Sequence, residues 1–154
     1  MSAAPVVGPA GADSDVEAFV AAHVGATPFH TARWGRAIEQ ATGHRWHPLV
    51  ARNASGAITG ILPMHHIRSR LFGSALVSSG FAVGGGILAD DAVTAMALAA
   101  AARDLAASLG LSAVELRGGI VPDGWDVVRD SHVGFERPLA ADDEAELAAI
   151  PRKH

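Results

Sequence analysis

The sequence has no cysteine, no tyrosine and a single lysine, Lys153. Without cysteine the chain can form no disulfide framework, no thiolate nucleophile and no thiolate metal site. Its apolar runs are shorter than the roughly 20 consecutive residues that a transmembrane helix needs. The first residues also lack the basic start of a signal peptide. Together these absences predict a cytoplasmic protein without a transmembrane segment.

Basic charge is also scarce. Acidic residues outnumber basic ones by 16 to 12, and the net charge is −4. This balance argues against a nucleic-acid-binding surface that covers the whole domain. Hydrophobic residues make up 49% of the 154 residues, which suffices for one domain or for one half of a two-lobed unit. The Ala-, Pro- and Gly-rich residues 1–12 are predicted to be a disordered leader, and residues 13–154 the folded domain.

Hydrophobic spacing predicts the order of the secondary structure. Helices are expected at 15–24, 31–42, 91–109 and 142–150, and strands at 45–52, 57–68, 74–79, 112–117 and 132–139. Gly35 lies inside the second helix at a cost of about 1 kcal/mol relative to alanine, which indicates close backbone packing. Pro63 cannot donate to a ladder, so its strand should be an edge strand or contain a bulge. We expect an α/β (α+β) fold with a mixed, largely antiparallel sheet flanked by helices.

A glycine-rich stretch, GFAVGGGILADD, joins the third strand to the longest helix at residues 80–91. Backbone N–H groups of such a loop, at a helix N-terminus, can cradle a phosphate. The coenzyme A loop of GNAT-type acyltransferases follows the pattern [QR]xxGx[GA], but neither Arg nor Gln precedes Gly84 here. Asp90 and Asp91 place negative charge where an anion would bind, and Asp90 is the expected N-cap. The stretch is interpreted as a strand-to-helix link, with a phosphate cradle as the alternative.

Eight histidines raise the question of a metal site. His65 and His66 are adjacent, so on a strand they point to opposite faces and cannot share an ion. Neither an HExxH nor a GxSxG motif occurs, so no metal site and no serine nucleophile is predicted. Arg68 and Arg70 form a small basic patch at the end of a strand. Their guanidinium groups suit a phosphate or a carboxylate, and a solvated hairpin tip is the alternative.

Several segments in combination resemble the N-terminal half of FemAB-like proteins, most closely the bacterial group associated with exosortase and PEP-CTERM systems. The matching pieces lie between about residues 26 and 153: TPFH with the tryptophan after it, GAITGILPMHHIRSRLFGSALVSS, the GGGILADD link and the final IPRK. The resemblance implies a GNAT-like fold used for acyl or aminoacyl transfer to an amine acceptor of the cell envelope or peptidoglycan. It also implies a second GNAT-like half after IPRK, so that this chain is an N-terminal half, inactive alone.

The expected substrate contacts are Trp34, Arg68, Arg70, Gly84, Gly85 and Gly86. The tryptophan and the glycines match positions of the family, and the two arginines are added because of their charge. Catalytic residues stay unassigned, because the resemblance implies a site in clefts formed with the second half. The implied partners are that missing half, an aminoacyl-tRNA or other acyl donor, and a cell-envelope precursor, without a cofactor. A coenzyme A-dependent GNAT N-acetyltransferase and a non-catalytic binding module remain as alternatives.

Overall fold

The computed structural model describes residues 4–71, 73–128 and 137–150. Its elements, in chain order, are β1 (Val6–Pro9), α1 (Asp13–Ala22), the 3-10 turn η1 (Pro28–His30), α2 (Ala32–Thr42), β2 (Arg45–Arg52), β3 (Ile58–Ser69), β4 (Gly73–Ser78), β5 (Leu88–Ala89), α3 (Ala92–Ser108), β6 (Val114–Glu115) and α4 (Asp143–Ala148). The strands form one sheet in the order β1-β2-β3-β4-β6, and β5 pairs with β3. All of these pairs are antiparallel except β4 with β6. The predicted mixed, largely antiparallel sheet is therefore confirmed.

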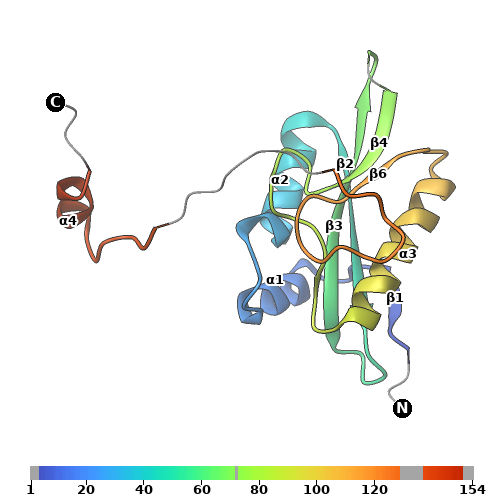
Figure 1. The fold of residues 1–154 in the computed structure, drawn as a ribbon, viewed down its shortest axis with the longest axis horizontal. Coiled ribbons are helices and arrows are strands. Elements are labelled where there is room, and N and C mark those ends of the chain that lie inside the picture. Colours follow the sequence, from blue (N-terminus) through green and yellow to red (C-terminus); the bar gives the residue numbers. More distant parts are fainter. Residues whose placement is uncertain (1–3, 72, 129–136, 151–154) are drawn as a thin grey trace.

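Helices cover both faces of this sheet (Figure 1). α1 and α2 pack on one face, against β2 and β3, and α3 lies along the other face in contact with all six strands. α4 stands apart from this body in Figure 1, and none of its residues is buried. The sheet therefore separates two helical layers, and the surfaces beside each layer have to be considered separately.

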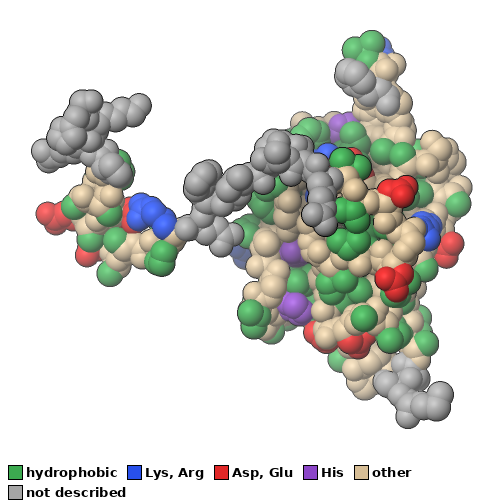
Figure 2. All heavy atoms as spheres, viewed as in Figure 1, with side chains coloured by type: hydrophobic (Ala, Val, Ile, Leu, Met, Phe, Trp, Pro, Cys, Tyr) green, Lys and Arg blue, Asp and Glu red, His purple; other side chains and the backbone are tan. Residues whose placement is uncertain are grey.

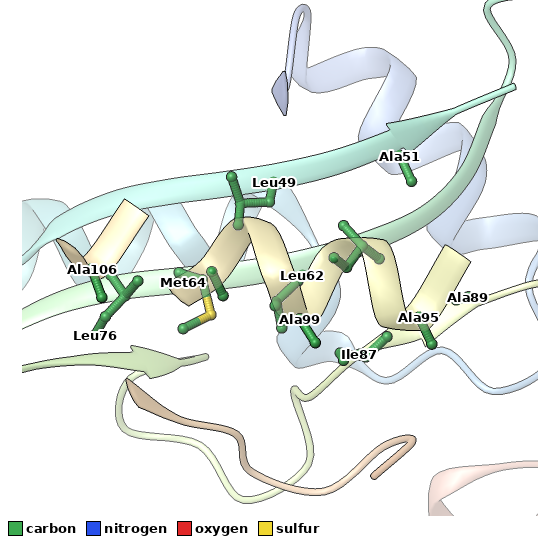
Figure 3. Packing of buried hydrophobic residues seen from close by; sticks show 12 residues of the cluster. Leu49, Ala51, Leu62, Met64, Leu76, Ile87, Ala89, Ala95, Ala99 and Ala106 are labelled. Carbon is green, nitrogen blue, oxygen red and sulfur yellow. The ribbon is translucent and has the colours of Figure 1, made fainter. Parts of the chain in front are cut away.

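Alternation of side chains along β3 builds a separate core on each face. Leu62 and Met64 point toward α3 and pack with Leu76 of β4 and Leu98 of α3 (Figure 3). Ile61 points to the other face and packs against α1. Several small alanines of α3, including those labelled along the helix in Figure 3, face the sheet. Their small side chains let this long helix approach the strands closely.

Gly35 fulfils the expectation of close backbone packing. A Cβ atom at this position would lie 2.2 Å from Cε2 of Trp46 on β2. α2 begins where the Thr31 side chain accepts a hydrogen bond from the Trp34 N–H at 3.2 Å, and it ends at Gly43 with φ 71°. Both ends follow the preferences for a hydroxyl N-cap and a left-handed C-terminal glycine.

The structure differs from the predicted leader at residues 6–9. These residues form β1, which pairs with β2 from Val6 opposite Arg52 to Pro9 opposite Leu49. Val7 packs against the α3-side core. An edge strand can be short and can end in proline, because only one side of it carries ladder hydrogen bonds. Composition alone therefore predicted disorder where long-range pairing with β2 forms a strand.

β3 is a central strand, so the edge position expected from Pro63 is wrong. The strand does contain a bulge in its pairing with β2, where the register shifts between Ala51 opposite Gly60 and Arg52 opposite Ile58, but this bulge lies away from Pro63. Pro63 lies opposite Pro48 of β2, and on its other side the β3–β4 ladder has just ended at Met64 opposite Ser78. The Pro63 carbonyl accepts a hydrogen bond from Ser79 at 2.6 Å, which places its missing N–H on the same side. Proline is tolerated here because no ladder acceptor faces it.

Other element boundaries agree with the sequence to within a few residues. The strand expected at 112–117 shortens to β6, and the N-cap of α3 is Asp91 rather than Asp90. The strand expected at 132–139 lies partly outside the described residues, and residues 137–139 form no strand. The helix expected at 142–150 is α4, capped by Asp142.

Candidate functional site

The segment from Ser79 to Gly86, here called the glycine loop, leaves the sheet between β4 and β5. β4 pairs with β3 as far as Met64, and β5 resumes pairing at Ile61 and Gly60. The loop is therefore an excursion inserted into one side of β3. It begins where Pro63 offers no ladder donor, which gives the interruption a local cause.

The η1 segment holds the far half of the glycine loop. Thr27 Oγ1 donates to the Gly84 carbonyl at 2.9 Å, and His30 Nε2 lies 3.2 Å from the Gly86 carbonyl. His30 Nδ1 accepts from the Thr27 N–H at 3.0 Å, so the ring is neutral and Nε2 carries the proton that Gly86 accepts. Burial of His30, which is 3% exposed, lowers its pKa below the ordinary value. The loop is thus fixed by a buried imidazole that has to stay neutral.

His65 of β3 holds the near half of the loop in the same way. Its Nδ1 accepts from the Gly80 N–H at 3.1 Å, and its Nε2–H donates to the Gly35 carbonyl at 3.3 Å. The side chain is fully buried, and burial lowers its pKa. Ser79 Oγ adds a short hydrogen bond to the Phe29 carbonyl. One neutral imidazole therefore links α2, β3 and the glycine loop.

Two of the three consecutive glycines make room for protein atoms. A Cβ atom at Gly86 would lie 1.8 Å from the Gly118 carbonyl oxygen, and one at Gly85 would lie 2.1 Å from Ser79 Cβ. Gly119 forms a parallel bridge with Ile87. The glycine loop, which follows β4, therefore packs backbone against backbone on the residues that follow β6, and this closes the gap between the two segments. At Gly84, by contrast, a Cβ atom would make only ordinary van der Waals contacts, with its nearest neighbours at 3.9 Å.

The start of α3 is already occupied by a carboxylate of the chain. The Asp91 side chain accepts from the Thr94 N–H at 2.7 Å, and this hydrogen bond lowers the pKa of Asp91. Its charge sits where a bound phosphate would interact with the positive end of the helix dipole. The interpretation of residues 80–91 as a strand-to-helix link, rather than a phosphate cradle, agrees with this arrangement.

Ser79 and Phe81 carry backbone strain. Their φ angles are 44° and 63°, and they are the two non-glycine residues with positive φ in the described part of the chain. Such conformations cost of order 1–3 kcal/mol each and concentrate at functional sites. Phe81 is 56% exposed and stacks on His44 with ring centroids 5.8 Å apart. The strained loop thus holds a large aromatic side chain at the surface.

A groove of about 280 Å³ opens beside Phe81, on the sheet face that also carries α1 and α2. Its floor is formed by Ile67, Ala75 and Val77, which share one face of the β3–β4 pair. Gly80 and Phe81 of the glycine loop line it as well. The groove combines an aliphatic floor with an aromatic side chain.

Glu115 and Arg117 are the charged residues that line this groove. They are two residues apart, so they lie on the same face after β6, and Arg117 Nε donates to Glu115 Oε1 at 2.6 Å. The Arg117 backbone N–H donates to Ser78 Oγ at 2.8 Å, and Nη1 reaches the Ala82 carbonyl at 3.4 Å. Side-chain exposures of 36% for Arg117 and 55% for Glu115 leave both open to a ligand. Sequence reasoning missed this pair, although the spacing in the predicted strand 112–117 could have indicated it.

Trp34 lies close to the glycine loop through one intermediate ring. It contacts Phe29 edge-on, with centroids 4.9 Å apart, and a Cβ atom at Gly84 would lie 3.9 Å from the Phe29 ring. Trp34 Nε1 is buried and has no hydrogen-bond partner among the described residues. The structure therefore brings the predicted contacts Trp34, Gly84 and Gly85 into one neighbourhood, at the surface of α2 and η1.

Arg68 and Arg70 lie on the β3–β4 hairpin, which projects from the body at the top of Figure 2. Both are exposed, and neither forms an ion pair with another described residue. Neither arginine is part of the glycine loop, and neither lines the groove. Within residues 4–71, 73–128 and 137–150, no group of His, Asp and Glu side chains is arranged to hold a metal ion.

No family model matches the sequence, and no curated protein matches it. Among solved structures, the chain is similar to the crystal structure of a GNAT family acetyltransferase from Staphylococcus aureus subsp. aureus USA300_TCH1516. The TM-score is 0.51 at 14% identity, over 90% of this chain and 100% of that chain. The fold is GNAT-like. At this identity the similarity shows the fold alone.

Among the described residues, no helix has the length and apolar character needed to cross a membrane.

Proposed function

We propose that this GNAT-like domain is part of an acyltransferase that moves an acyl or aminoacyl group onto an amine acceptor. The observation that carries the proposal is the groove over β3 and β4, which combines an aliphatic floor with the Glu115–Arg117 pair beside the strained glycine loop. A site of this size fits a small polar acceptor, because sites for drug-sized ligands span about 300–1,000 Å³. The GNAT-like neighbour, an acetyltransferase by name, supports the same reaction class.

The FemAB-like resemblance of the sequence supports a finer version of this proposal. In that version the donor is an aminoacyl-tRNA, the acceptor is a cell-envelope precursor, and a second GNAT-like lobe completes the site. The closed packing at Gly86 and the acidic N-cap of α3 favour a donor other than coenzyme A, because both oppose a pyrophosphate at the glycine loop.

Transfer assays with the chain alone and with the product of its complete reading frame test this version. Each protein is incubated with aminoacyl-tRNA and a muropeptide amine, and product mass is followed by liquid chromatography and mass spectrometry. We expect transfer by the two-lobed product and none by residues 1–154 alone. The half-domain version fails if the reading frame ends at His154 and the chain alone transfers the group.

A coenzyme A-dependent N-acetyltransferase is the second candidate, favoured by the name of the structural neighbour. Thermal unfolding with acetyl-CoA separates the two. Ligand at 100 times its dissociation constant stabilises the native state by about 2.7 kcal/mol. The closed loop predicts no such stabilisation, and a saturable shift would favour the second candidate over the first.

A further inference from the structure

We propose that the groove beside Phe81 binds a free α-amino acid with a small aliphatic side chain, with its carboxylate on Arg117 and its ammonium on Glu115. The inference deepens the broad form of the proposed function, acyl transfer to an amine, on which it rests for one step: the bound amino acid would be the amine acceptor, in place of the cell-envelope precursor of the FemAB-like version. The recognition itself is argued from the groove residues alone.

Two opposite charges sit side by side at the groove. Arg117 Nε and Glu115 Oε1 are 2.6 Å apart. Among the described residues, Arg117 Nη2 and Glu115 Oε2 have no hydrogen-bond partner, so they are left for a ligand. Arg117 is also held from the glycine loop by the Ala82 carbonyl and through its own backbone by Ser78. A zwitterion matches this arrangement, because each of its charged ends meets the opposite sign. A ligand with a single charge would be attracted by one member of the pair and repelled by the like charge of the other.

The rest of the groove fits an aliphatic side chain. Ile67, Ala75 and Val77 supply a floor without charge, and Phe81 stands beside them with more than half of its side chain exposed. Ala75 lies directly opposite Ile67 in the β3–β4 register, so its single methyl group leaves depth beside the larger residue. A volume of about 280 Å³ is large enough for a small amino acid.

The strained backbone gives a reason for the position of Phe81. At φ 63° the aromatic side chain is turned outward, stacked on His44, while Gly80 next to it is fixed by His65. A phenylalanine in this conformation needs support from the surrounding structure, and five loop hydrogen bonds from η1, β3 and Arg117 supply it. An aromatic wall held in place before binding loses little entropy when a ligand packs against it.

Binding is tested by two-dimensional amide NMR titration of the full 154-residue chain with three probes. L-leucine carries both charges, 4-methylpentanoate lacks the ammonium, and 3-methylbutylamine lacks the carboxylate. We expect leucine to shift the amides of Ala75, Val77, Phe81 and Arg117. Each single-charge probe should bind at least about tenfold more weakly, as expected for loss of one charge-assisted hydrogen bond.

Variants localise the site. Arg117→Gln and Glu115→Gln should each weaken leucine binding at least about tenfold, whereas Arg103→Gln, on the opposite face of the sheet, should not. Ala75→Leu fills the floor and should abolish binding, with the exposed Ala100→Leu on α3 as its matched control. The single-charge probes act on the unaltered chain, so the test stands even if a variant misfolds.

The proposal is overturned if leucine fails to saturate by roughly 10 mM, ten times a 1 mM dissociation constant, or if the shifted amides lie away from the groove. Equal binding of the three probes overturns it as well. No acyl donor is present in these titrations. Leucine bound in the groove but never acylated would defeat the proposed function alone, and acyl transfer to amines that leave the groove amides unshifted would defeat this inference alone.

Discussion

Replacing His65 by glutamine should reduce the pH dependence of folding stability. The folded chain holds this imidazole neutral, because Nδ1 accepts a hydrogen bond from the Gly80 N–H and because burial of the ring lowers the pKa of His65. An unfolded chain has no such restraint and titrates near pH 6.5. Below that pH the unfolded state binds a proton that the folded state does not. The stability that His65 contributes is therefore complete above pH 6.5 and is lost as the pH falls toward the folded pKa.

The size of the His65 contribution follows from the linkage between proton binding and the free energy of unfolding. A group that titrates at 6.5 when unfolded and stays neutral when folded changes stability by about 1.36 kcal/mol per pH unit below 6.5. Between pH 7.5 and 5.5 His65 should account for up to about 1.4 kcal/mol of the loss. His30, His47 and His66 also have pKa values lowered by burial, so the wild-type chain contains their contributions too. The prediction therefore concerns the difference between wild type and His65→Gln.

Urea unfolding at pH 7.5 and pH 5.5 measures that difference. With slopes of about 1–3 kcal/mol per molar urea, 1.4 kcal/mol corresponds to roughly 0.5–1.4 M in the midpoint. The wild-type midpoint should fall by that much more than the midpoint of His65→Gln between the two pH values. His30→Gln should behave in the same way, because its Nδ1 accepts from Thr27. If wild type and His65→Gln lose the same stability on acidification, a neutral His65 clamp is the wrong explanation of the loop.

Three further substitutions test the packing. Gly86→Ala places a methyl group against the Gly118 carbonyl and should destabilise the chain by about 1–3 kcal/mol in urea unfolding; an unchanged midpoint would contradict the closed gap. Gly35→Ala should cost a similar amount despite the better helix propensity of alanine, since its Cβ meets Trp46, and a stabilised variant would show that α2 can move away. Thr31→Ala removes the α2 N-cap and should cost about 1 kcal/mol, measured by thermal unfolding, whereas Thr31→Ser should retain most of that stability.

The sheet and its helices could be predicted because their signals are local. The apolar runs in residues 45–52 and 57–68, separated by a short turn with Asn53 and Gly56, indicate the two strands of the β2–β3 hairpin, which the structure reproduces to within a residue. The interior Gly35 likewise predicted close packing, since a helix tolerates that cost only where a side chain would not fit. Pro63 misled for a related reason: its missing N–H was read as the mark of an edge, but it faces a place where the neighbouring strand has left the sheet.

The candidate site could not be predicted in the same way, because it is assembled from segments far apart in the sequence. His30 and His65 are buried clamps of the glycine loop, and they lie 56 and 15 residues away from the loop residues that they hold, Gly86 and Gly80. Neither has a local pattern that announces this role. Burial of an imidazole with a backbone donor on one nitrogen and a carbonyl on the other appears only once η1, β3 and the glycine loop are in place.

The glycine loop shows how one sequence feature can support two different chemistries. Small residues before a helix permit a backbone to approach a phosphate, and they equally permit a backbone to approach another backbone. Here the second use prevails, since Gly86 packs on Gly118 and Asp91 caps α3. The ligand-accessible surface is thereby displaced to the neighbouring groove, where Phe81 stands outward and Arg117 and Glu115 bring both signs of charge. The loop acts on that groove as a rigid support, and the chemistry of binding belongs to the side chains around it.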